Sequence, residues 1–184
     1  MILTYKGHRI FAFSDTHGMH ERVIIPKGIE ILICVGDVES DFCNIETFMA
    51  WYASIPAKLR LFTPGNHDLS FDLNPCLADK ETISDVIILR SRIFDFEDLT
   101  FCSIDARPWL FGPTKIPNNV DFLLTHGAAK GYLDNGKGCI HLSDTILRHK
   151  PKVHLFGHIH ECGNRSLKEE RTEYHNVCLY KEFM

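Results

Sequence analysis

Short runs of β-branched and aromatic residues recur along the chain, and polar residues or glycine follow each run. Runs of this length and composition are typical of buried β-strands. The predicted strands are Ile10–Ser14, Ile31–Val35, Leu59–Thr63, Val86–Leu89, Val120–Thr125 and Val153–Phe156. The pattern therefore predicts six strands that contribute to the core.

A helical pattern stands between the second and third of these runs. One predicted helix face carries Ile45, Phe48, Met49 and Tyr52 at i, i+3, i+4 and i+7. This helix is expected to end before Pro56, because the residue that precedes a proline avoids the helical conformation. A second helix is predicted over Leu142–His149, with Pro151 stopping it.

The segment Arg92–Asp105 has a different pattern. Its polar and apolar residues alternate on either side of Glu97 and Asp98, which predicts an antiparallel hairpin. Strands that alternate with helices early in the chain indicate βαβ units. Together with the hairpin, they predict an α/β fold with mixed sheets.

The composition narrows the class of protein. The chain has 184 residues, of which 45% are hydrophobic, and this predicts a single domain over residues 1–184. The formal charge is −4 and neither sign forms a long block, which argues against an extended nucleic-acid groove. The seven cysteines include no C-x-x-C pair, and no stretch is long and apolar enough to span a membrane. A cytoplasmic protein with free thiols is expected, and its oligomeric state stays open.

Residues able to bind metal ions follow five of the six predicted strands. The carboxyl ends of strands border the ligand crevice in open α/β sheets, so these residues are expected to converge. Each short motif that carries these residues is, taken alone, also typical of a polar turn. Five such motifs, each at the end of a predicted strand, favour a metal site. The candidate ligands are Asp15, His17, Asp37, Asn66, His126, His158 and His160.

This set supplies two carboxylates, four imidazoles and one amide oxygen, but no thiolate. It is too rich in nitrogen for calcium and lacks the sulfur of structural zinc sites. Manganese is therefore favoured, with iron or catalytic zinc as alternatives. Because seven ligands exceed what one ion needs, we expect two ions about 3.5–4 Å apart with one bridging carboxylate.

The ordered pattern D-x-H, G-D, G-N-H-D, H and G-H-x-H resembles the signature of the calcineurin-like metallophosphoesterases. Longer matches are SDTHGMH at 14–20, GNHDLSFD at 65–72 and PKVHLFGHIHE at 151–161. They resemble the metallophosphoesterase-domain-containing branch, which is related to class III cyclic-nucleotide phosphodiesterases. The resemblance implies a four-layer α/β/β/α sandwich of two mixed β-sheets flanked by helices.

The resemblance also implies a role for each site residue. The first metal ion would be held by Asp15, His17, Asp37 and His160. The second would be held by Asp37, Asn66, His126 and His158. Asp37 would be the bridge, and a hydroxide between the ions would attack phosphorus. His67 would protonate the leaving-group oxygen, with Asp68 as the partner that orients it.

Three further residues are candidate substrate contacts. His20 lies close to the first motif, and Arg107 lies in a proline-rich loop. Lys137 ends a G-x-x-x-x-G-K stretch, which we interpret as a rim loop because Gly138 replaces the Ser or Thr of a phosphate-binding loop. Trp109, in the same loop as Arg107, is a candidate stacking platform for a base, but a packing role is favoured for it.

Three histidines outside the motifs are not expected to bind metal ions. His154 lies inside the last predicted strand, which favours a core position. His8 and His175 are expected at the surface.

The ligand set together with His67 predicts a binuclear metal-dependent phosphoesterase that hydrolyses small phosphodiesters, with cyclic nucleotides among the candidate substrates. A phosphomonoesterase or a small nuclease would use the same residues. A hypothesis of another class is a catalytically weak metal- or nucleotide-binding regulatory protein. Because no ligand and no general acid is missing, the enzyme is favoured over the regulator.

Overall fold

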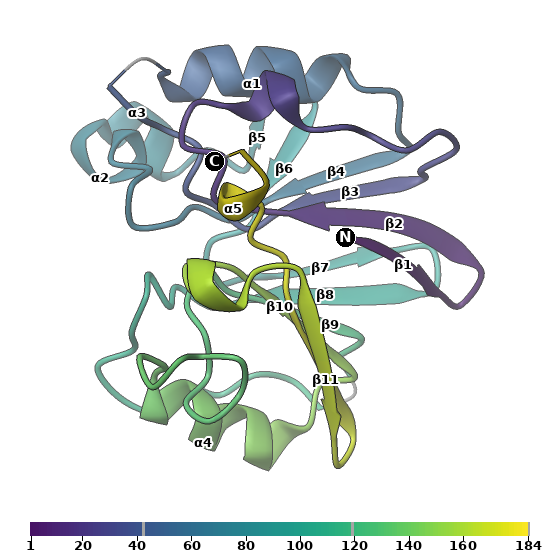
Figure 1. The fold of residues 1–184 in the computed structure, drawn as a ribbon, viewed down its shortest axis with the longest axis vertical. Helices are drawn as coiled ribbons and strands as arrows, with labels where there is room; N and C mark the ends of the chain where they lie inside the picture. Colours follow the sequence, from purple (N-terminus) through teal and green to yellow (C-terminus); the bar gives the residue numbers. More distant parts are fainter. Residues whose placement is uncertain (42, 119, 184) are drawn as a thin grey trace.

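The computed structural model contains two β-sheets that stack face to face (Figure 1). It describes residues 1–41, 43–118 and 120–183. Each sheet has six strands, and in each the four inner strands are parallel while an antiparallel strand pairs at either edge. The predicted α/β class with mixed sheets is therefore confirmed.

The first sheet has the strand order β1-β2-β3-β4-β6-β5. Its strands are β1 (Ile2–Tyr5), β2 (His8–Phe13), β3 (Ile31–Cys34), β4 (Leu59–Phe62), β5 (Thr82–Ile83) and β6 (Val86–Ile88). In the parallel register, Ile10 of β2 stands beside Ile31 of β3, which stands beside Leu59 of β4.

The second sheet has the strand order β11-β12-β10-β9-β8-β7. Its strands are β7 (Ile93–Phe96), β8 (Leu99–Ser103), β9 (Phe122–Leu124), β10 (Val153–Phe156), β11 (Arg165–Glu169) and β12 (Thr172–Asn176). The β7–β8 pair is the predicted hairpin, and Glu97 takes φ 51° in its tight turn.

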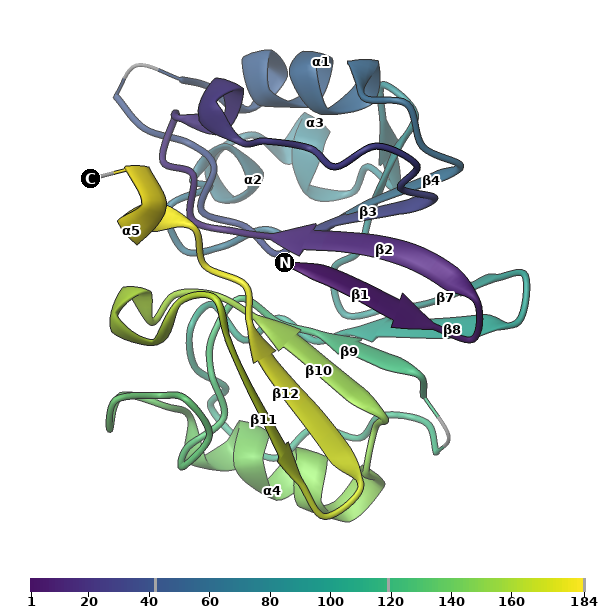
Figure 2. The same cartoon turned by 45° about the vertical axis from the view of Figure 1, so that its right-hand side comes forward.

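Helices cover the outer face of each sheet, with α1 above the first and α4 below the second (Figures 1 and 2). The α-helices are α1 (Ile45–Ser54), α2 (Ser70–Leu73), α3 (Pro75–Ala78), α4 (Ile140–His149) and α5 (Tyr180–Phe183). Two short 3₁₀ helices are η1 (His20–Arg22) and η2 (His160–Cys162). No helix in the described part of the chain is long and apolar enough to cross a membrane.

Three apolar clusters fill the spaces between the four layers. Within β3, Ile31 and Ile33 belong to the cluster between the sheets, while Leu32 and Cys34 belong to the cluster beneath α1. Successive side chains of a strand point to opposite faces, so a strand buried on both faces is apolar throughout. The four-layer α/β/β/α sandwich that the resemblance implied is confirmed.

All six predicted strands are present, and Val153–Phe156 matches residue for residue. The predicted face of α1 is buried as expected, whereas α4 begins earlier than predicted, at Ile140. The sequence pattern missed β1, β5, β11 and β12. The residues of β11 are mostly exposed and polar, so this strand is held by pairing with β12 and gives no burial signal.

Two surface predictions were wrong. His8 is 8% exposed and its Nε2 lies 2.9 Å from Oδ1 of Asp98 in the β7–β8 turn. His175 is 7% exposed, with Nδ1 2.7 Å from Oγ of Ser166 on β11. His8 stands beside Tyr5 of β1 and His175 beside Ser166 of β11, and the pattern predicted neither of these edge strands. His154 is fully buried, as predicted.

Candidate metal centre

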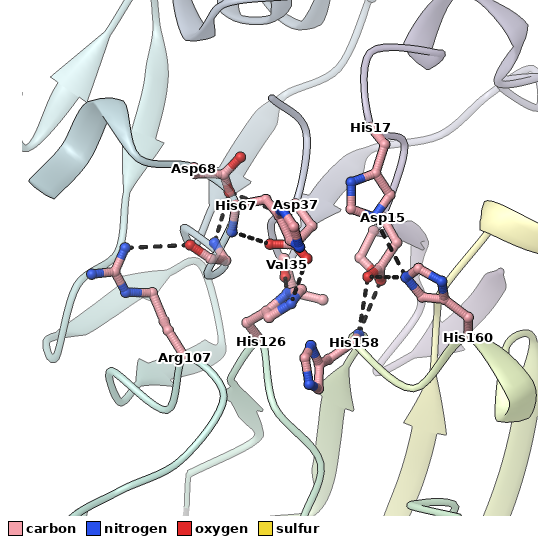
Figure 3. A network of polar contacts seen from close by, with 12 residues as sticks. Asp15, His17, Val35, Asp37, His67, Asp68, Arg107, His126, His158 and His160 are labelled. Atoms are coloured by element: carbon pink, nitrogen blue, oxygen red, sulfur yellow. Dashed lines mark hydrogen bonds and ion pairs between the residues drawn. The ribbon is translucent and has the colours of Figure 1, made fainter. Parts of the chain in front are cut away.

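Two groups of side chains gather where the two sheets meet at the carboxyl ends of their strands. One group is Asp15, His17 and His160, and the other is Asp37, His126 and His158. Within each group the ligand atoms all lie within 4.8 Å of one another. The structure thus brings together six of the seven predicted ligands, from positions far apart in the chain (Figure 3).

Backbone hydrogen bonds hold the motif loops against one another. The N–H of Asp15 donates to the carbonyl oxygen of Gly36 at 2.9 Å, and that of His17 donates to the carbonyl oxygen of Asp37 at 3.0 Å. In the second sheet, the N–H of Gly157 donates to the carbonyl oxygen of His126 at 2.9 Å. The parallel register therefore continues past the strand ends and sets the spacing of the loops.

Four of the candidate ligands have a left-handed backbone, which is uncommon for residues other than glycine. The φ angles are 57° at Asp15, 44° at His17, 55° at Asp37 and 64° at His158. Such conformations cost of order 1–3 kcal/mol each and persist only where surrounding contacts enforce them. Their concentration here indicates a site whose geometry is maintained at the expense of local stability.

Hydrogen bonds from backbone N–H groups orient both carboxylates. The N–H of His158 donates to the Asp15 carboxylate at 3.1 and 3.2 Å, and Ser14 Oγ donates to it as well. The N–H of His67 donates to Oδ1 of Asp37 at 2.8 Å. Burial opposes ionisation of Asp37, but His126 outweighs it and holds the pKa of this carboxyl well below its usual range. Both carboxylates are therefore fixed and anionic.

The surroundings of His126 fit a cation. Its Nδ1 lies 2.8 Å from the carbonyl oxygen of Val35, which can only accept, so Nδ1 donates and Nε2 is the nitrogen that faces Asp37. That buried Nε2 has no hydrogen-bond partner among the described residues and lies 3.1 Å from Oδ2 of Asp37. Burial lowers the pKa of His126, but Asp37 and Asp15 raise it to about 9. A positive charge is therefore favoured between these groups.

The other donors agree with this interpretation. Burial lowers the pKa of His17, and burial together with His126 lowers the pKa of His158 to about 4, so both imidazoles are neutral and available as ligands. The buried Oδ1 of Asn66 has no hydrogen-bond partner in the described part of the chain. Nitrogen and oxygen donors without thiolates fit the manganese, iron or zinc expected from the sequence.

Asp68 does not orient His67 as expected. Its buried carboxylate accepts hydrogen bonds from four backbone N–H groups, at distances of 2.7–3.1 Å, namely those of Asp37, Val38, Glu39 and Gly65. Burial, together with Asp37, raises the pKa of Asp68 to about 6. Because these donors occupy both oxygens, Asp68 acts as a positioning residue that ties the Gly36–Glu39 loop to the Gly65–Asp68 loop.

His67 is exposed beside the two groups, and its ring centroid lies 5.1 Å from that of His17. It also lines a groove of about 360 Å³ together with Glu39, Ser40, Asp41, Leu69, Ser70, Leu73 and Asn74. His67 therefore stands between the candidate ligands and a space that could hold part of a ligand.

Two of the predicted substrate contacts are held elsewhere. His20 is 3% exposed and packs against the rings of Phe48 and Trp51. It is therefore part of the core and is not available to contact a substrate. The guanidinium of Arg107 pairs with Asp72 and Asp105 and donates to the carbonyl oxygen of Gly65 at 3.3 Å. Because these contacts occupy the guanidinium, Arg107 supports the Gly65–Asp68 loop (Figure 3).

Lys137 lies in an exposed loop, where its Nζ pairs with Oε1 of Glu161 at 2.7 Å. Glu161 follows His160, so this ion pair stands beside a candidate ligand. Trp109 is 57% exposed and donates from Nε1 to the carbonyl oxygen of Lys137 at 3.1 Å. Trp109 is therefore not the packing residue that was favoured, because the proline-rich loop lies on the surface and exposes more than half of this residue.

Tyr180 also lies at the site, although no sequence motif predicts it. Its ring centroid lies 5.1 Å from that of His17 and 4.5 Å from that of His160. Tyr180 begins α5, which returns to the site after β12. No motif marks this residue, and only the path of the chain brings it to two candidate ligands.

Comparison with known proteins agrees with this geometry. Metallophosphoesterase domain-containing protein 1 of Homo sapiens, like that of Mus musculus, is 27% identical over 217 residues, covering 93% of this chain and 66% of the relative. UPF0046 protein K07C11.7 of Caenorhabditis elegans is 26% identical over 185 residues, covering 83% of this chain and 63% of the relative. The chain thus spans about two thirds of the length of these relatives. A model of the calcineurin-like phosphoesterase family matches residues 8–162, and the chain belongs to this family.

Proposed function

We propose that the protein is a metal-dependent hydrolase of small phosphodiesters. The observation that carries the proposal is the pair of ligand groups beside one exposed imidazole, that of His67. Ligand groups of this kind hold the ions of hydrolases that act on phosphate esters. Family membership supports the same class of reaction.

Two divalent or trivalent ions would occupy the groups, with manganese favoured by the mixture of nitrogen and oxygen donors and iron or zinc as alternatives. When bound, such ions activate water and neutralise the charge that develops on the phosphoryl oxygens. Asp15, His17 and His160 would hold one ion, and His126, His158 and Asn66 the other. Asp37 would be the ligand shared by both ions, which is the role that the family resemblance implies for it, and its carboxylate lies 3.1 Å from Nε2 of His126.

His67 would serve as the general acid. Its own N–H holds the Asp37 carboxylate, so the position of the imidazole is linked to the candidate bridging ligand. Its side chain is exposed, and an imidazole can give a proton to a departing oxygen near neutral pH. The groove beside it would receive the leaving group.

The charge of this groove favours a diester over a monoester. Glu39 and Asp41 line it, and its described lining contains no lysine or arginine. A phosphodiester carries one negative charge, whereas a monoester carries about two near neutral pH. Because carboxylates repel the more highly charged ester, small diesters are the preferred class, and cyclic nucleotides are the first natural candidates to screen.

The test compares hydrolysis of bis-p-nitrophenyl phosphate with that of p-nitrophenyl phosphate. Wild type and His67→Ala are stripped of metal and reloaded with manganese, and bound metal is measured in each. We expect metal-dependent turnover of the diester that falls at least ~100-fold in His67→Ala, while bound manganese stays unchanged. His141→Ala is the matched control, because His141 belongs to neither ligand group.

The outcomes separate the alternatives. Faster hydrolysis of the monoester would replace the proposal by a phosphomonoesterase. Equal activity of wild type and His67→Ala would remove His67 from the mechanism. If the metal-loaded protein hydrolyses neither ester, the proposed activity is wrong, and nucleotide binding that raises the melting temperature would then favour the regulatory protein.

A further inference from the structure

A second pocket lies at the opposite end of the second sheet from the candidate metal centre. It has a volume of about 320 Å³ and is lined by Asn118, Arg148, His149, Lys150, Lys152 and Arg171. Lys152 immediately precedes β10, while His158 follows the other end of that strand. The strand β10 has four residues, so its two ends lie about 13 Å apart at a rise of about 3.3 Å per residue. The pocket is therefore distinct from the metal centre.

The basic side chains of this pocket come from three segments. Arg148 and His149 lie in the last turn of α4, Lys150 and Lys152 lie between α4 and β10, and Arg171 lies in the turn between β11 and β12. Both views of the fold place the β11–β12 turn near α4 (Figures 1 and 2). The tertiary structure therefore gathers these cations from positions 148 to 171 around one concave surface.

Few carboxylates neutralise this cluster. Lys150 Nζ lies 3.6 Å from Oε2 of Glu170, and both side chains are largely exposed. Within the described residues, the side chains of Arg148, Lys152 and Arg171 form no ion pair or hydrogen bond. Since the whole chain has a formal charge of −4, this concentration of positive charge is not a general property of its surface.

The helix dipole accounts for only part of the cluster. Basic residues in the last turn of a helix interact favourably with its negative end, which explains Arg148 and His149. It does not explain Lys152, which lies beyond the helix, or Arg171, which lies on another element. Lys150 has φ 51°, a conformation that favours glycine or asparagine at the end of a helix. A lysine is therefore less favourable for the backbone at this position than glycine would be, but it adds a positive charge.

We propose that this pocket binds a compact polyphosphate anion. Guanidinium groups bind phosphate oxygens in a bidentate manner, and lysines add point charges around them. A compact anion fits better than a nucleic-acid strand, because the cations surround one concave surface and the exposed Glu170 stands beside them. Binding here would be independent of the reaction at the metal centre.

The test is calorimetric titration of the metal-loaded protein with tripolyphosphate at low ionic strength. The variants are Lys152→Glu and Arg171→Glu, whose exposed side chains form no ion pair within the described residues, so the fold should persist. The matched control is Lys27→Glu, the same charge reversal at an exposed lysine in the first half of the chain. Tripolyphosphate can also chelate metal ions and bind at the metal centre, but it does so equally in all four proteins. Differences in affinity between the proteins therefore report on the pocket.

We expect each pocket variant to weaken tripolyphosphate binding at least ~10-fold and Lys27→Glu to change it less than ~2-fold. The affinity should also fall as salt is added. Equal binding by all four proteins would overturn the proposal. A second titration uses a short single-stranded oligothymidylate, and a strand that binds more tightly than tripolyphosphate and depends on the same lysine and arginine would also overturn it, in favour of a nucleic-acid surface.

Discussion

The backbone N–H of Asp37 donates to Oδ2 of Asp68 at 2.8 Å, although the two residues belong to different strand-end loops. The same oxygen accepts from the N–H of Gly65 at 2.7 Å. One buried carboxylate thus links the loop of a candidate metal ligand to the loop of the candidate general acid. Asp68 was expected to orient the side chain of His67. Its carboxylate instead binds the backbone of the two loops that carry Asp37 and His67.

Removing this carboxylate should disrupt both loops. Asp68→Ala leaves four N–H groups without an acceptor, three of them buried, and each unsatisfied buried group costs about 1–3 kcal/mol. We therefore expect a loss of at least about 3 kcal/mol in the free energy of unfolding, measured with urea, and reduced manganese content. Asp41→Ala, at an exposed carboxylate, should change stability by less than about 0.5 kcal/mol. If Asp68→Ala is as stable as Asp41→Ala, the linking role is wrong.

Metal stoichiometry tests the division into two groups. We expect about two ions per chain in wild type and about one in either His160→Ala or His158→Ala, because each variant removes a donor from one group. Asp37→Ala should lose both ions if its carboxylate bridges them. Elemental analysis after dialysis gives the counts, with His141→Ala as the control that retains two. A wild-type count of one ion would contradict the binuclear proposal.

A methyl group at Gly65 should damage the site directly. A Cβ at this position would stand 2.6 Å from the backbone nitrogen of Asp37 and 2.8 Å from Nδ1 of His126. Gly65→Ala should therefore cost about 1–3 kcal/mol of stability and reduce metal binding, because neither neighbour can move without displacing a ligand. Gly112→Ala is the matched control, since nothing lies within 4 Å of its Cβ position. Similar melting temperatures and metal contents for the two variants would refute this prediction.

His154 should make stability depend on pH. Burial lowers its pKa to about 3, and its Nε2 lies 2.8 Å from Oγ of Thr125, whose hydroxyl donates to the carbonyl oxygen of Gly127. Below about pH 6.5 the unfolded chain binds a proton that the folded chain excludes. The free energy of unfolding should therefore fall as pH decreases from about 6.5 towards about 3, by up to about 1.4 kcal/mol per pH unit.

Urea unfolding of wild type and His154→Leu at several pH values isolates this contribution. The variant loses a hydrogen bond and is expected to be less stable at neutral pH, but its stability should depend less on pH in this range. Parallel pH profiles for the two proteins would show that His154 does not titrate as inferred.

Local sequence pattern was enough to predict the central strands, the buried face of α1 and the order of the metal-binding motifs. These features depend on local pattern, since a strand that is covered on both faces must be apolar along its length, as Ile31–Cys34 is. The convergence of Asp15, Asp37, His126 and the two histidines after β10 also followed from the pattern, because parallel strands deliver their carboxyl ends to the same edge.

The partner that each polar group takes depends instead on the folded arrangement of the chain. Asp68 binds backbone N–H groups, Arg107 is held by two carboxylates, and His20 is enclosed by aromatic rings, although their sequence neighbours suggested other roles. The edge strands that stand beside His8 and His175, the return of Tyr180 to the site and the pocket that contains Arg171 likewise depend on segments distant in the chain. Hydrogen bonds and ion pairs act over a few ångströms in space, so sequence spacing cannot specify them until the fold has set those distances.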